Sequence, residues 1–177
     1  MSIPAIPDTP ARPPAPIRIT RGYAPGALGR VVELHGLYYS RAWGFGPQFE
    51  AEVATELAEF LGRYDPARDG FWLAWQDGRI MASVTLDHRP VDGETGARVR
   101  WFVADAAARG TGVGGRLFDA LLAFAAATGQ TGLYLWTFEG LTAARRLYDR
   151  AGFRLTASEA FADWGPTVTA QRMQRGP

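Results

Sequence analysis

The sequence predicts a single α/β (α+β) domain in which about seven strands are flanked by about four helices. The first observation is length, because 177 residues suffice for one domain with a sizeable core and are too few for two. The second is the period of the apolar residues, which changes along the chain from three or four to two and back. The third is a glycine-rich segment at residues 109–116, between a predicted strand and a predicted helix.

The composition is typical of a folded domain and excludes several kinds of chemistry. Apolar residues make up 47% of the chain and charged residues 21%. The absence of cysteine excludes disulfides, thiolate nucleophiles and cysteine-type zinc sites. A net charge of +1 argues against a nucleic-acid partner, and no apolar run approaches the ~18 residues that cross a bilayer. The N-terminus does not resemble a signal peptide, so we expect a cytoplasmic protein with no membrane partner.

The N-terminal third predicts an arm, a strand and two helices. Residues 1–16 hold six of the twelve prolines and predict a flexible arm, which places the domain at 17–177. A short strand begins at Ile17. Apolar residues then recur at spacings of three and four over 28–39 and at a strict spacing of four over 49–61, which indicates two helices.

Three antiparallel strands are predicted next, as a meander. Apolar residues alternate over 71–75, 80–86 and 99–103. An Asp-Gly pair at 77–78 is typical of a two-residue hairpin turn, and a second pair at 92–93 predicts the next turn.

The last part of the chain predicts alternating helices and strands. A helical period begins at Gly112, a strand follows over 133–138, and a helix follows over 140–151. Two alternating stretches between 153 and 175 complete the order.

The segment before the third helix carries the candidate ligand site. It reads Arg109, Gly110, Thr111, Gly112, Val113, Gly114, Gly115 and Arg116. Glycine lets the backbone approach a ligand closely, and the first turn of a helix offers free N–H groups at the positive end of the helix dipole. Two arginines add fixed charge, so the segment predicts a phosphate cradle. The alternative is a glycine-rich loop with no ligand.

The same glycines also match the dinucleotide-binding pattern, which we reject. Gly110, Gly112 and Gly115 fit G-x-G-x-x-G, but that motif needs its first glycine at a strand end, inside a parallel βαβ unit. Here five residues separate the strand end near Ala104 from Gly110, and hairpins join the preceding strands.

At this segment the chain resembles the GNAT family of N-acetyltransferases. The pattern Arg109-x-x-Gly112-x-Gly114 is similar to the family's acetyl-CoA signature, Arg/Gln-x-x-Gly-x-Gly/Ala. Residues 147–153 are similar to the family's Leu-Tyr-x-x-x-Gly-Phe, and the order of elements fits over about 17–174. More narrowly, 100–103 and 135–141 resemble GNAT domains fused behind MarR-type regulators, although here a Pro-rich arm precedes the domain.

The resemblance implies a GNAT fold, whose twisted sheet is mixed and mostly antiparallel, and an acetyl-CoA-dependent activity. The acetyl group would move to a primary amine of a small molecule or peptide by direct attack on the thioester. Backbone groups at Phe102, Val103 and Ala104 would bind the pantetheine arm, 110–115 would hold the pyrophosphate, and Arg109 and Arg116 would flank it. A homodimer is common in the family. The alternative is a non-catalytic module that binds or senses acyl-CoA.

Tyr148 is the residue that the resemblance places near the thioester sulfur. A phenol is protonated at neutral pH and can donate to a departing thiolate as a general acid. Its spacing from Leu141 and Ala144 puts it on an apolar face, where a tyrosine is usually core. Many family members have an asparagine at the position of Leu141, which leaves that contact to the cofactor open.

The sequence leaves the proton acceptor open between Glu139, His35 and a water chain. Glu139 ends the strand after the glycine-rich loop, where it also suits the start of the next helix. His35 has a suitable intrinsic pKa but shares an apolar face with Tyr39. Aromatic residues in and just after the first helix suit a flat or cationic acceptor, or pack as core. The two histidines lack partners at metal-ligand spacing, so no metal is predicted.

Overall fold

The computed structural model describes residues 14–176, and its elements follow the predicted order. The strands are β1 (Arg18–Arg21), β2 (Gly70–Gln76), β3 (Arg79–Asp87), β4 (Ala97–Ala104), β5 (Leu133–Phe138), β6 (Arg154–Phe161) and β7 (Val168–Arg175). The helices are α1 (Ala27–Trp43), α2 (Pro47–Gly62), α3 (Val113–Ala127) and α4 (Thr142–Arg150), with a 3₁₀ turn η1 (Ala106–Ala108). The arm predicted over 1–16 lies almost wholly outside the described residues.

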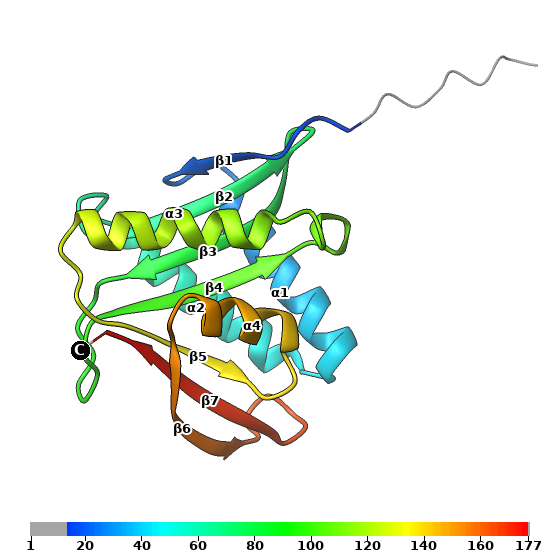
Figure 1. Cartoon of the computed structure of the whole chain (residues 1–177). Helices are drawn as coiled ribbons and strands as arrows, with labels where there is room; N and C mark the ends of the chain where they lie inside the picture. The colour runs from blue at the N-terminus through cyan, green and yellow to red at the C-terminus, as the bar shows by residue number, and fades with distance from the viewer. Residues whose placement is uncertain (1–13, 177) are drawn as a thin grey trace, which may run out of the picture.

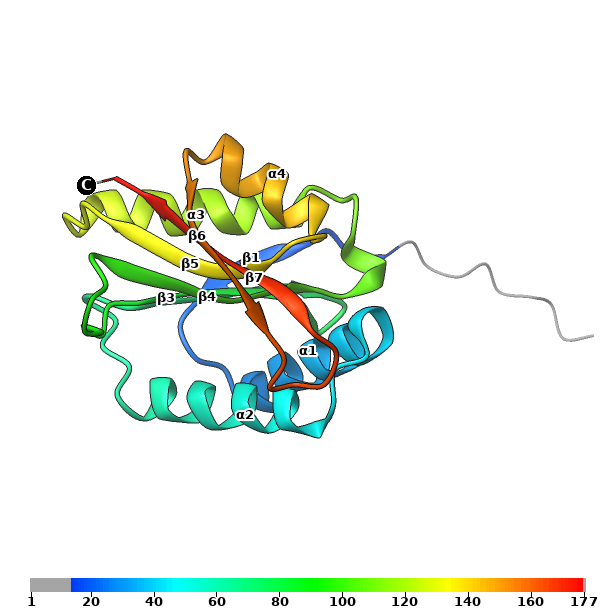
Figure 2. The same cartoon turned by 90° about the horizontal axis from the view of Figure 1, so that it is seen from below.

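The seven strands form one sheet between two helical layers. Their order is β1-β2-β3-β4-β5-β7-β6, and every neighbouring pair is antiparallel except β4–β5. Helices α3 and α4 cover one face and α1 and α2 cover the other (Figures 1 and 2). The predicted fold class, a mixed and mostly antiparallel sheet flanked by four helices, is confirmed. None of the helices within 14–176 has the length and hydropathy of a membrane span.

An apolar core lies on each face of the sheet and holds its helices in place. On one face Leu117 and Leu121 of α3 pack against the sheet, and all three of Leu117, Leu121 and Leu86 are fully buried. On the other face Leu57 of α2 packs with Phe71. Burying one such side chain stabilises by about 1.5–3 kcal/mol, and α1, α2 and α3 each bury several residues, whereas α4 buries Tyr148 alone.

A bulge in β4 moves its side chains from one face to the other. The register with β3 shifts between Ser83 and Thr85, Trp101 has a φ of 46°, and the Ser83 hydroxyl donates to the Trp101 carbonyl at 2.8 Å. Val99 therefore packs on the α3 side and Trp101 on the α1–α2 side. The strand predicted over 99–103 is present, but a bulge inserts one extra residue into it, so its apolar residues do not all share one face.

Strands β4 and β5 touch at one end only. They pair at Ala97 with Leu133 and at Arg98 with Tyr134, and then diverge towards their C-terminal ends (Figure 1). Gly96 permits the close approach at the paired end, because it has a φ of 92° and a Cβ there would overlap the carbonyl of Gly132. Beyond Arg98, the edge of β4 that faces β5 is therefore unpaired.

Candidate active site

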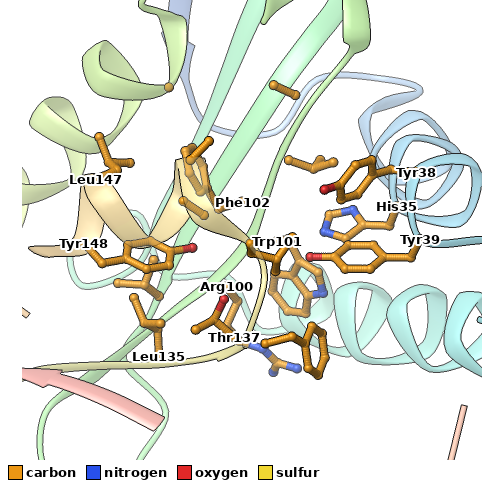
Figure 3. A pocket seen from close by; sticks show the side chains of 18 of the residues that line it. His35, Tyr38, Tyr39, Arg100, Trp101, Phe102, Leu135, Thr137, Leu147 and Tyr148 are labelled. Carbon is orange, nitrogen blue, oxygen red and sulfur yellow. The ribbon is translucent and has the colours of Figure 1, made fainter. Parts of the chain in front are cut away.

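A cavity of about 840 Å³ opens where β4 and β5 separate. Its walls come from α1, α2, α4, the two diverging strands, the turn before α3 and the β6–β7 loop. We call the part next to α3 the donor end, and the part between α1, α2 and the β6–β7 loop the acceptor end. Figure 3 shows side chains from both ends around the shared space.

The donor end contains the start of α3, where backbone N–H groups are free. Gly112 caps the helix with a φ of 77°, no side chain caps it, and its first turn has no acidic residue. The N–H groups of Val113, Gly114 and Gly115 have no acceptor among residues 14–176. A Cβ built on Gly110 would meet nothing within 4 Å. A helix start of this kind, with open space before it, fits a phosphate group.

The predicted cofactor-binding residues divide into two groups. Those that line the cavity are Phe102, Val103, Ala104, Arg109, Gly110, Gly112, Val113, Gly114 and Gly115. The Arg109 guanidinium lies 4.6 Å from the centre of the Tyr38 ring. Thr111 and Arg116 are not part of the lining: the Thr111 hydroxyl donates to the Ala108 carbonyl, and Arg116 donates two hydrogen bonds of 3.2 Å to the Ile17 carbonyl.

Tyr148 belongs to the core by its ring and to the cavity by its hydroxyl. The ring centre lies 6.2 Å from that of Phe102, 5.5 Å from Phe118 and 6.1 Å from Phe153. The hydroxyl points into the cavity (Figure 3). Burial raises the pKa of Tyr148 well above its ordinary value, so the phenol stays protonated. The position of Tyr148 is therefore compatible with both of its predicted roles, packing in the core and donating a proton.

Three side chains of α1 face Tyr148 from the opposite wall. Tyr38, His35 and Tyr39 direct their polar atoms towards the same space as the Tyr148 hydroxyl (Figure 3). The His35 Nδ1 atom lies 2.8 Å from the Val31 carbonyl oxygen. Because a carbonyl can only accept, Nδ1 carries the hydrogen, and Nε2 of the neutral ring has a free lone pair. Burial lowers the pKa of His35 to about 4, so the ring is neutral at pH 7.

The acceptor end is closed by aromatic rings. The ring centre of Trp164, in the β6–β7 loop, lies 4.9 Å from that of Phe49 and 5.6 Å from that of Phe138. The Trp164 indole N–H donates to Glu52 at 2.7 Å. Tyr39 stacks on Phe45 with ring centres 5.6 Å apart. The aromatic residues of α1 thus belong both to the cavity wall and to the core, and Trp164 of the β6–β7 loop packs in the same cluster.

The floor of the acceptor end, formed by β4, carries charged side chains that no sequence motif indicated. Arg98 and Arg100 of β4 line it together with Glu56 of α2. Arg100 forms ion pairs with Glu56 and, at 3.7 Å, with Asp87. The alternation of β4 before its bulge could have placed both arginines on one face, but no local pattern links them to α2.

Glu139 lies away from this arrangement. It is exposed, its backbone N–H donates to the Thr169 carbonyl at 2.9 Å, and it is not among the residues that line the cavity. Of the sequence-predicted proton acceptors, His35 is the side chain at the cavity. Within 14–176, no group of three or more histidine or acidic residues is arranged to hold a metal ion.

A comparison with known families shows which family the protein belongs to. The sequence model of the Acetyltransferase (GNAT) family matches residues 29–153. The chain belongs to the GNAT acetyltransferase family. Members of this family transfer acetyl groups from acetyl-CoA.

Individual relatives agree with this assignment. The mycothiol acetyltransferase of Geodermatophilus obscurus is 39% identical over 119 residues, which are 64% of this chain and 38% of the relative, so the chain spans well under half of that protein. An N-acetyltransferase from Staphylococcus aureus Mu50 superposes with a TM-score of 0.72 at 15% identity, over 92% of this chain and 99% of that one.

A second solved structure is informative because it was determined with a ligand. This protein from Salmonella typhimurium, solved with its cofactor acetyl-CoA, has a TM-score of 0.66 at 19% identity, over 90% of this chain and 94% of that one. At such identities the likeness of both solved structures shows the fold alone, and that fold is the predicted GNAT fold.

Proposed function

We propose that this GNAT protein is an N-acetyltransferase that moves the acetyl group of acetyl-CoA to a primary amine of a small molecule or peptide. The observation that carries the proposal is the continuity of the cavity. One space joins the free N–H groups at the start of α3 to the hydroxyl of Tyr148 and to the acceptor end beyond it. A donor and an acceptor can therefore meet at the middle of the cavity, beside Tyr148.

The donor end fits acetyl-CoA through backbone groups. The unpaired edge of β4 at Phe102–Ala104 would bind the pantetheine arm as an added strand would. The N–H groups of 113–115 would hold the pyrophosphate, and the charge of Arg109 would lie beside it. When bound, acetyl-CoA supplies an acetyl group activated as a thioester.

Tyr148 is proposed as the general acid. Its Oη atom holds a proton throughout the neutral pH range, because burial raises the pKa of the phenol. The hydroxyl lies in the cavity while the ring is fixed by Phe102, Phe118 and Phe153. As the amine nitrogen bonds to the acetyl carbon and the C–S bond breaks, the phenol gives its proton to the departing thiolate sulfur without movement of the ring. The proton that the amine loses restores the phenol, so the products are the N-acetylated amine and CoA.

His35 is proposed to orient the acceptor. Its Nδ1–H is committed to the Val31 carbonyl, which leaves Nε2 as an acceptor for an N–H of the attacking amine. A pKa of about 4 makes the ring a weak base but keeps it neutral, so it does not repel a cationic amine as it enters. Glu139 has no role in this mechanism, because it is exposed outside the cavity lining.

A second candidate function, acyl-CoA binding without transfer, is favoured by one observation. Leu141 lines the cavity at the position where many GNAT members have an asparagine, so one polar contact to the co-substrate is lost. The resemblance to domains fused behind MarR-type regulators, which would suit such a role, stays a prediction from the sequence. The cytoplasmic location and the homodimer also stay predictions.

The release of free CoA distinguishes the two functions. The protein is incubated with acetyl-CoA and a panel of primary amines, and the free thiol of CoA is measured with a thiol reagent. Because the chain has no cysteine, the protein adds no thiol of its own to this signal. Amine-dependent release supports the transferase. Saturable acetyl-CoA binding by calorimetry, with no release for any amine, would contradict it and support the binding module.

A further inference from the structure

Arg98 lies on the floor of the acceptor end without a partner for its charge. It occupies the last position at which β4 pairs with β5, and it lines the cavity. Its Nε atom is buried and has no hydrogen-bond acceptor among residues 14–176. No carboxylate within these residues lies within ion-pair distance of its guanidinium. A partly buried cation in this state is costly unless a ligand supplies the anion.

The charged side chains next to Arg98 on the strands are already paired with other residues. Asp87 stands opposite Arg98 in the β3–β4 register, but its carboxylate accepts from Arg63 at 2.6 Å and pairs with Arg100 at 3.7 Å. Arg100 is further paired with Glu56. Among the described residues on this part of the cavity floor, Arg98 is therefore the arginine whose charge has no ion-pair partner.

The adjacent strand has a second buried polar atom without a partner. Tyr134 stands opposite Arg98 in the β4–β5 register, and its hydroxyl is buried with no hydrogen-bond partner among residues 14–176. Buried polar atoms in folded proteins are nearly always bonded, so two exceptions at paired positions are unusual. Tyr134 does not line the cavity, so of the two residues only Arg98 can bond a ligand there.

The chemistry of this place favours a carboxylate. A guanidinium binds a carboxylate through two parallel N–H···O bonds, and the Nε of Arg98 would supply one of them. One uncompensated positive charge balances a monoanion. A phosphate dianion would add surplus negative charge beside Glu52 and Glu56, which line the same end of the cavity.

The distance to Tyr148 fixes the shape of the acceptor. Phe102, which touches the Tyr148 ring, is four residues after Arg98 on β4, and four residues of strand span about 13 Å. The bulge at Trp101 shortens this span, so the carboxylate and the amine of one acceptor would be on the order of 10 Å apart. An extended tripeptide has about this length between its two ends.

We propose that the acceptor is an elongated amino carboxylate whose carboxylate is bound by Arg98 at the far end of the cavity. The inference rests on the proposed N-acetyltransferase function and names the class of its acceptor. Arg98 is a specificity residue: it selects among amines and takes no part in the transfer of the acetyl group.

The test compares matched peptides that differ in one charge. Triglycine and triglycinamide present the same amine, and only triglycine has a C-terminal carboxylate. The wild-type kcat/KM should favour the acid by about 10-fold or more, as one charge-assisted contact is worth. Arg98→Gln should bring the acid-to-amide ratio to about one. Arg98→Lys keeps the charge without the fork of donors and should keep part of the preference.

Controls separate this inference from the function on which it rests. Arg68→Gln removes an exposed arginine away from the cavity lining and should keep the wild-type ratio. Equal kcat/KM values for acid and amide in the wild type would overturn the inference and leave acetyl transfer intact. Absence of CoA release with every amine of the panel would overturn the proposed function itself.

A binding measurement gives a second readout that does not depend on turnover. Calorimetry on the CoA-loaded protein should show tighter binding of triglycine than of triglycinamide, with the difference lost in Arg98→Gln. If the two peptides bind equally to the wild type, or if a folded Arg98→Gln keeps the difference, the carboxylate site is not at Arg98.

Discussion

At the donor end of the cavity the ligand-facing groups belong to one contiguous stretch, residues 102–115, and most of them are backbone atoms. The acceptor end is lined instead by side chains from α1, α2, β4, β5 and the β6–β7 loop. A backbone site tolerates many side-chain changes, provided that the glycines remain. In a site made of side chains, a substitution can change which ligand is bound. Under the proposed function, the donor that the family shares would bind at the backbone end, and the acceptor that an individual member selects would bind at the side-chain end.

Tyr148 lies where the two ends meet, and its hydroxyl should give the largest effect. Tyr148→Phe keeps the ring that packs on Phe102 and Phe118 and removes only the proton donor. Turnover should fall by about 10²–10⁴, the usual range for general acid–base catalysis. The KM for acetyl-CoA should move little, because an interaction made only in the transition state leaves binding intact. A folded variant with wild-type turnover would return Tyr148 to a purely structural role.

The glycine that caps α3 should control binding at the donor end. Gly112→Asp places a carboxylate at the start of the helix and strains a backbone with a φ of 77°. Repulsion of the pyrophosphate and loss of its N–H contacts should weaken CoA binding by about 10²-fold, measured by calorimetry.

Gly129 offers a matched control for that strain. It follows the other end of α3, has a φ of 71°, and a Cβ there would also meet nothing within 4 Å. Gly129→Asp should cost similar stability without changing CoA affinity. Equal losses of affinity in both variants would mean that Gly112 acts through the fold and not through the ligand.

Substitutions of the two arginines in the segment 109–116 should have smaller effects, and these effects should differ between the two positions. Arg109 lies in the cavity wall, whereas Arg116 is committed to the Ile17 carbonyl. Arg109→Gln should raise the KM for acetyl-CoA by about 5-fold, the equivalent of about 1 kcal/mol for an exposed charge. Arg116→Gln should leave that KM unchanged. The reverse order in steady-state kinetics would show that Arg116 turns towards the ligand.

The glycine-rich loop and the start of α3 were predictable because their signals are local, and phosphate binding there stays a prediction. The phosphate cradle depends on glycines within six positions and on the helix that starts beside them, and both are visible in the order of residues. The hairpin at 77–78 was predictable for the same reason, since Asp77 and Gly78 both have positive φ values, as that turn requires.

The acceptor end was not predictable because it depends on contacts between distant segments. Trp164 meets Glu52 across 112 positions of the chain, and no periodicity in either segment indicates the other. The bulge at Trp101 was not predictable either. Apolar residues alternate in the sequence on both sides of it, although the bulge moves Trp101 to the α1–α2 face of the sheet. Arg98 could be placed on a face of β4, but only the packed structure shows that Asp87 is already occupied.

His35 provides an effect of a different kind, a dependence of stability on pH that arises at the acceptor end. Burial lowers its pKa to about 4 in the folded protein, from about 6.5 in the unfolded chain. The unfolded state therefore binds a proton more readily, so the stability from the neutral ring is complete above pH 6.5 and is lost as the pH falls towards 4. Between pH 7.5 and 5 the loss should be roughly 2 kcal/mol, which lowers the melting temperature by about 4–8 °C. His35→Gln removes the titrating ring, so this part of the pH dependence should disappear in thermal unfolding at the two pH values. An unchanged drop in a folded His35→Gln variant would assign the pH dependence to other groups and leave the ring of His35 open to solvent and free to charge.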